Sequence, residues 1–199
     1  MIKAIFFDLH KVVTYGEFAA IEHTVARRAN VSPEVVTQFH RDHLDGLLVG
    51  SVTSQDMLTA FGLDAKMTVP QLLAIWTEEV SALMYADPAI LELLLKLRNN
   101  YTLAALTNLT EQRYEADVFM GLYAYFDFSI LSFKEGIKKP DHRFFLRALE
   151  EAACLPSEAV FIDDQIKNTD AAQELGIHAI QYKNYEHLME RLKLLGVEV

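Results

Sequence analysis

Short apolar runs alternate with longer segments of helical periodicity along most of this chain. Residues 2–7 are apolar except at Lys3, and they are rich in β-branched and aromatic side chains. A short run of this kind predicts a strand that is buried on both faces, as in a parallel sheet. Four more runs predict further strands, at residues 101–106, 128–131, 159–162 and 178–181.

Helical patterns follow these strands in turn. Apolar spacing predicts helices at residues 89–98, 110–119, 140–153, 169–175 and 185–195. Because strands and helices alternate, we expect an α/β fold whose parallel strands are joined by right-handed crossovers. With 199 residues, 51% of them hydrophobic, the chain can form one core domain with a modest insertion.

Residues 14–85 interrupt the alternation, because this segment shows helical patterns and no convincing strand. Helices are predicted at residues 17–29, 33–48, 54–61 and from about 68 to 84. We therefore expect an α/β core domain of residues 1–13 and 86–199 and a small all-helical domain of residues 14–85. The apolar side chains of the second helix are expected in the interior of that helical domain: Phe39, Leu44, Leu47 and Leu48.

Charge and cysteine content narrow the possible partners and compartments. A net charge of −10 argues against nucleic acid and against an anionic membrane surface, since both require basic patches. The single cysteine, Cys154, permits no internal disulfide and indicates a reducing compartment. No apolar run reaches the length of a membrane span, and no signal-peptide pattern precedes the first strand, so a cytoplasmic protein is expected.

Three of the predicted strands end at polar residues. Asp8 follows the first strand, Thr107 and Asn108 follow the second, and Asp163 with Asp164 follows the fourth. The carboxyl ends of neighbouring parallel strands meet at one edge of a sheet, so these groups should converge. Three carboxylates there would repel one another, and a hard divalent cation such as Mg²⁺ would relieve the repulsion. With a lysine from residues 138–139 nearby, the pattern predicts Mg²⁺-assisted phosphoryl transfer.

Four segments resemble the motifs of the haloacid dehalogenase-like hydrolase superfamily. They are residues 6–10, 106–108, 139–141 and 160–164, the last followed by Asn168 and by Ala171-Ala172. The chain is similar to members of this superfamily that carry a helical cap inserted after the first strand. The resemblance implies a Rossmann-like core of three layers around a parallel sheet.

The resemblance also implies a role for each motif residue. Asp8 would be the nucleophile that forms an aspartyl-phosphate, and Lys139 would neutralise the charge that develops; Lys138 is the alternative lysine. Thr107 and the backbone N–H of Asn108 would hold the phosphoryl oxygens. Mg²⁺ would be coordinated, directly or through water, by Asp8, Asp163, Asp164 and the backbone carbonyl of His10.

His10 is the main departure from the family pattern. Phosphatases of this family usually have a second Asp at this position, as the general acid and base, and a Gly at the position of Lys11. An imidazole can donate and accept a proton near neutral pH, so His10 could perform that role. The alternative is that His10 marks lost chemistry.

The sequence therefore predicts a Mg²⁺-dependent phosphatase for a small phosphorylated metabolite, such as a sugar phosphate, acting as a monomer or homodimer. A catalytically impaired protein that binds a phosphometabolite or another protein is the first alternative. A dehalogenase is the second, and the paired acids Asp163 and Asp164 disfavour it, since the dehalogenase branch lacks them.

Overall fold

A parallel sheet forms the centre of the protein, as the computed structural model shows for residues 1–16, 18–63 and 66–198. Within these residues the sheet has five strands in the order β5-β4-β1-β6-β7. Every neighbouring pair in it is parallel. The strands are β1 (Ala4–Phe7), β4 (Thr102–Thr107), β5 (Phe128–Leu131), β6 (Ala159–Asp163) and β7 (His178–Gln181). This arrangement confirms the predicted α/β fold.

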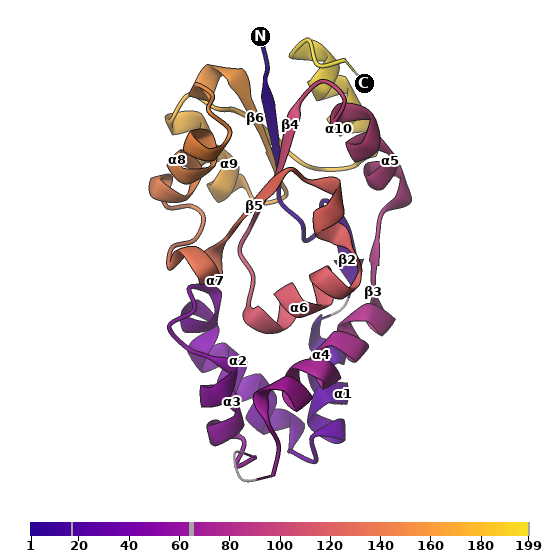
Figure 1. Cartoon of the computed structure of the whole chain (residues 1–199), viewed down its shortest axis with the longest axis vertical. Coiled ribbons are helices and arrows are strands. Elements are labelled where there is room, and N and C mark those ends of the chain that lie inside the picture. The colour runs from indigo at the N-terminus through magenta and orange to yellow at the C-terminus, as the bar shows by residue number, and fades with distance from the viewer. Residues whose placement is uncertain (17, 64–65, 199) are drawn as a thin grey trace.

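Helices cover both faces of the sheet and complete three layers. In Figure 1, α8 (His142–Glu151) and α9 (Ile166–Glu174) lie on one side of the strands. Helices α5 (Pro88–Leu97) and α10 (Tyr185–Leu194) lie on the other. Successive β1 side chains serve the two layers, because strand residues alternate between faces. Ile5 and Phe7 belong to the cluster that contains α5 and α10, and Ala4 and Phe6 to the cluster that contains α8 and α9.

Local capping sets the start of several helices. Pro88 opens α5, and the preceding Asp87 accepts a hydrogen bond from the N–H of Ala89 at 2.9 Å.

The structure also contains short elements that the sequence pattern did not indicate: α7 (Ser132–Glu135) and the 3₁₀ turns at Leu122–Tyr125 and Pro156–Glu158.

The helices between β1 and α5 pack around an interior of their own. We call α1 (Phe18–Arg28), α2 (Pro33–Leu48), α3 (Ser54–Ala60) and α4 (Val69–Leu83) the inserted helices. Figure 1 shows them together at the end of the molecule remote from both termini. Their shared cluster includes the fully buried Leu72 and Trp76, and Ala116 joins it from α6 (Glu111–Phe119) of the core. The predicted helix start at Glu17 lies outside the described residues.

Two expectations for residues 14–85 were wrong. Strands β2 (Thr14–Gly16) and β3 (Met84–Ala86) form an antiparallel pair at the two ends of this segment. Three residues per strand are too few for an alternating pattern to show. Leu44, which is 47% exposed, and Leu48, which is only partly buried, are not in the interior either, whereas Phe39 and Leu47 are buried as expected. The division into two domains stays a prediction.

No helix among the described residues combines the length and apolar character that crossing a membrane requires.

Candidate active site

The carboxyl ends of β1, β4 and β6 bring the predicted polar residues together. Phe7 pairs with Ala105 of β4 and Ile162 of β6, so the next residues of all three strands emerge at the same edge. The N–H of Asp8 continues the ladder by donating to the carbonyl of Ile162 at 2.8 Å. Asp8, Thr107 and Asp163 are each at most 5% exposed.

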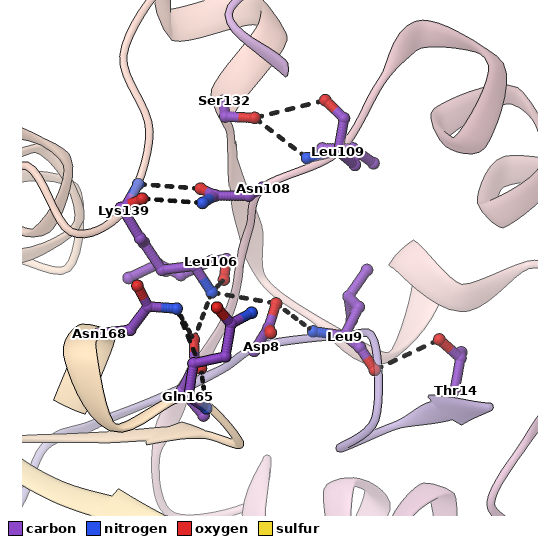
Figure 2. A network of polar contacts seen from close by, with 11 residues as sticks. Asp8, Leu9, Thr14, Leu106, Asn108, Leu109, Ser132, Lys139, Gln165 and Asn168 are labelled. Atoms are coloured by element: carbon purple, nitrogen blue, oxygen red, sulfur yellow. Dashed lines mark hydrogen bonds and ion pairs between the residues drawn. The ribbon is translucent and has the colours of Figure 1, made fainter. Parts of the chain in front are cut away.

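Lys139 is the cation at the centre of this edge. Its Nζ lies 3.0 Å from Asp8 Oδ1 and donates to the carbonyl of Leu106 at 2.7 Å (Figure 2). It also lies 2.6 Å from Asp163 Oδ2. These three partners engage all three ammonium protons. Lys138, the alternative lysine, points elsewhere and pairs with the exposed Asp45 on α2.

The side chain of Asn108 holds the backbone of Lys139 in place. Asn108 Oδ1 accepts from the Lys139 N–H at 2.9 Å, and Asn108 Nδ2 donates to the Lys139 carbonyl at 2.9 Å. Sequence analysis assigned Asn108 a role for its backbone alone and did not foresee this contact. The buried Ser132 steadies the same loop, because its Oγ accepts from the N–H of Leu109 at 3.0 Å (Figure 2).

The two acids after β6 have different surroundings. Asp163 Oδ1 accepts from the N–H of Gln165 at 2.8 Å and from Asn168 Nδ2 at 3.0 Å. Its Oδ2 accepts from Lys139 and, at 3.0 Å, from Asn168. Asp163 is therefore saturated by protein donors. Asp164 is only half-buried and borders a small cavity that Asp8 and Lys139 also line.

The acidic cluster suits a hard divalent cation. One carboxylate oxygen each from Asp8, Asp163 and Asp164 can be chosen so that all lie within 4.8 Å of one another. Burial raises the pKa of Asp8 to about 6, Lys139 opposes that rise, and the charge of Asp163 adds to it. Burial and Asp163 also raise the pKa of Asp164. The single positive charge of Lys139 thus compensates the negative charges of the three acids only in part. Carboxylate oxygens grouped in this way are suitable ligands for Mg²⁺.

His10 lies in a tight loop between β1 and β2. The loop closes where the N–H of Lys11 donates to the carbonyl of Thr14 at 2.7 Å, and Lys11 has φ +64°. Glycine adopts this left-handed conformation without steric strain, which explains why the family usually has a glycine at the position of Lys11. Burial, then the charges of Arg113 and Lys11, lower the pKa of His10 to about 4. The ring is therefore neutral at neutral pH, and its buried Nδ1 has no hydrogen-bond partner among the described residues.

Two neighbouring cavities share lining residues at this site. The smaller, of about 90 Å³, is polar and is lined by Asp8, His10, Lys11, Asn108, Lys139, Asp164, Gln165 and Asn168. The larger, of about 230 Å³, extends between α2 and α6 and also touches Thr107. His10 and Asn108 border both cavities.

A buried ion pair that the sequence pattern did not predict lies beside the larger cavity. Arg113 Nε lies 2.6 Å from Asp117 Oδ1, and both side chains project from α6. Arg113 also donates to Thr14 Oγ1 at 2.8 Å and contacts Met84 Sδ, so it reaches both β2 and β3. The available signal was an Arg and an Asp four residues apart on one helix, a spacing that more often marks an exposed pair.

A family model places this chain among known proteins. The description "haloacid dehalogenase-like hydrolase" belongs to a model that matches residues 18–182. Since the match spans most of the sequence, the chain belongs to the haloacid dehalogenase-like hydrolases.

Two curated relatives match parts of the chain. It is 41% identical over 70 residues to acyl-CoA dehydrogenase family member 10 of Mus musculus. It is 36% identical over 69 residues to a sesquiterpene phosphatase of Aspergillus oryzae. Each match covers 35% of this chain but only 6% and 32% of the respective relatives, so less than a third of either relative is spanned.

A solved structure shares the whole fold. An enzyme of this family from Bacteroides thetaiotaomicron, in complex with magnesium and inorganic phosphate, superposes with a TM-score of 0.72 at 23% identity. The alignment covers 94% of this chain and 99% of that one.

Proposed function

We propose that this protein is a Mg²⁺-dependent phosphatase that hydrolyses a small phosphorylated metabolite through an aspartyl-phosphate on Asp8. The observation that carries the proposal is the buried Lys139, which joins Asp8 to Asp163 beside Asp164. Family membership supports hydrolysis, and the phosphatase relative and the magnesium and phosphate complex support the phosphomonoester substrate.

The two oxygens of Asp8 differ in their contacts, and this supports Oδ2 as the attacking atom. Oδ1 accepts from the N–H of Leu9 at 2.8 Å and pairs with Lys139. Oδ2 would form the bond to phosphorus while the bond from phosphorus to the leaving oxygen breaks, and the leaving oxygen would take a proton from water. Thr107, the N–H of Asn108 and the Lys139 ammonium stabilise the charge on the phosphoryl oxygens.

Hydrolysis of the aspartyl-phosphate then requires a base for water. His10 borders the polar cavity and its ring is neutral at neutral pH, so it can accept that proton. Asp8, Asp164 and the backbone carbonyl of His10 would hold Mg²⁺ directly, and the negative charge of the saturated Asp163 would favour the ion beside them. The bound cation would offset negative charge on the carboxylates and the substrate.

Phosphate release from a panel of phosphomonoesters, with Mg²⁺ and with a chelator, tests this proposal. We expect release that depends on Mg²⁺, and at least a thousandfold loss in Asp8→Asn because no phosphoenzyme can form. Asp42→Asn on the exposed face of α2 is the matched control and should retain the wild-type rate. Equal rates in wild type and Asp8→Asn would refute the proposal, and metal-independent halide release from a 2-haloacid would favour a dehalogenase.

The second candidate is a phosphometabolite binder with little turnover. His10 favours it, since a neutral ring cannot protonate a leaving alkoxide. His10→Asp separates the two. A slow wild type that this substitution accelerates supports the binder, whereas an active wild type that it slows supports catalysis by His10.

A further inference from the structure

The larger cavity has the lining expected around an apolar group. Leu9 and Leu109 contribute from the loops that follow β1 and β4, and Leu44 and Leu48 contribute from α2. This cavity shares His10 and Asn108 with the polar one. A phosphomonoester held at Asp8 would thus extend its leaving group between α2 and α6.

Apart from His10 and Thr107, which the proposed phosphoryl chemistry uses, the polar side chains that line this cavity are engaged within the protein. Both ends of the Asn108 amide bond the backbone of Lys139, and Thr110 Oγ1 accepts from the N–H of Arg113 at 3.4 Å. Arg113 itself bonds Asp117 and Thr14. A sugar placed here would give up water around its hydroxyls for few new partners, which is costly.

Charge balance excludes a second anionic group in the same place. Arg113 is the cation that lines the cavity, and Asp117, 2.6 Å from it, lines the cavity too. Both are buried, so their charges compensate each other at short range with little screening. Among the described residues that line the cavity, none therefore offers an uncompensated positive charge to a carboxylate or a further phosphate.

We propose that the substrate's leaving group is an uncharged alkyl or aryl alcohol rather than a sugar, with its apolar part in the cavity bounded by Leu9, Leu44, Leu48 and Leu109. This inference rests on the phosphatase function proposed above. The cavity of about 230 Å³ accommodates roughly eight methylene-sized groups, if each needs the roughly 30 Å³ of a liquid water.

A series of n-alkyl phosphates from ethyl to octyl, with glucose 6-phosphate for comparison, tests this. The ratio kcat/KM should rise about fourfold with each added methylene, because each transfers from water to an apolar lining. It should level off near eight carbons and exceed the value for glucose 6-phosphate about a hundredfold. A value that does not change with chain length, or a preference for the sugar phosphate, would overturn the inference.

Leu44→Gln tests the lining itself. It should lower kcat/KM for octyl phosphate about tenfold or more and lower the ratio between octyl and ethyl phosphate. Leu146→Gln is the matched control, since Leu146 is also a helical leucine, is 48% exposed against 47% for Leu44, and lies on α8 outside this cavity. It should leave every rate unchanged. An identical loss in both variants, or none in Leu44→Gln, would contradict the proposed lining.

Binding separates this inference from the proposed function. Alkylphosphonates, which are not hydrolysed, should bind wild-type protein with Mg²⁺ more tightly as the chain lengthens, with a negative heat-capacity change. Failure to hydrolyse any phosphomonoester would refute the phosphatase, while chain-dependent phosphonate binding that Leu44→Gln weakens would still support the apolar subsite. Phosphate release without such binding would refute the subsite alone.

Discussion

At the scale of single residues, the site depends on one buried ammonium among three acids. Burial acts against the charge of Lys139, yet Asp8 and Asp163 raise its pKa above the ordinary value. Each member of this group is buried only because the others are, since an isolated ion in such a place would be strongly destabilising. Lys139 therefore stabilises the fold as well as serving the proposed chemistry.

Lys139→Met should lower the free energy of unfolding of the metal-free protein by about 3–5 kcal/mol, because it leaves Asp8 and Asp163 buried without a cation. Urea unfolding with a chelator present measures this. Lys138→Met is the control from the neighbouring position, where the partner is the exposed Asp45, and stability should hardly change. Equal losses in both variants would contradict this account of the ion cluster.

At the scale of elements, α6 connects the core to the inserted helices. Its Gln112 donates to Ser54 Oγ of α3 at 2.9 Å, and its Arg113 reaches Thr14 of β2. Ala116 packs into the interior of the inserted helices. Helix α6 also follows Thr107 and Asn108 closely in sequence. The segment that leads out of β4 past these motif residues therefore also packs against α3 and α4.

Arg113→Met should destabilise the protein by about 3–5 kcal/mol, because Asp117, 1% exposed, would keep its charge without a partner. The double variant Arg113→Met with Asp117→Leu should recover most of that loss, as apolar replacements of buried pairs often do. Chemical unfolding of the single and double variants measures the effect. A double variant as unstable as Arg113→Met would show that contacts to Thr14 and Met84, rather than the pair, carry the stability.

At the scale of the whole molecule, the acidic cluster adds local repulsion to a net charge of −10. A cation bound at Asp8, Asp163 and Asp164 would relieve that repulsion in the folded state, where the three groups are assembled. The unfolded chain separates them and should bind the ion weakly. Cation binding and folding are therefore coupled.

Mg²⁺ at about a hundred times its dissociation constant should stabilise the protein by about 2.7 kcal/mol. For a chain of this length that corresponds to a rise of roughly 5–10 °C in Tm, measured by thermal unfolding. KCl at matched ionic strength controls for charge screening. Asp164→Asn should abolish most of the Mg²⁺ shift. A shift of equal size in KCl, or an undiminished one in Asp164→Asn, would refute binding at this cluster.

Much of the fold could be predicted from the sequence because the spacing of hydrophobic residues within a short segment indicates whether it forms a strand or a helix. The run at residues 2–7 predicted β1, and the runs near residues 101, 128, 159 and 178 predicted the other strands of the sheet. Elements of three or four residues, such as β2, β3 and α7, are too short for a period to appear. Leu44 also escaped prediction, because helical spacing cannot show that a leucine faces a cavity.

By itself, the sequence determined which strands form and which polar groups follow them, since β-strand patterns and strand-end residues are properties of short segments. Tertiary structure alone decided that Lys139 rather than Lys138 joins Asp8, that Asp163 is saturated while Asp164 borders the cavity, and that Arg113 and Asp117 are buried. The physical reason is that partners distant in sequence set the burial and hydrogen bonding of a side chain. Those partners meet only when the sheet and helices pack.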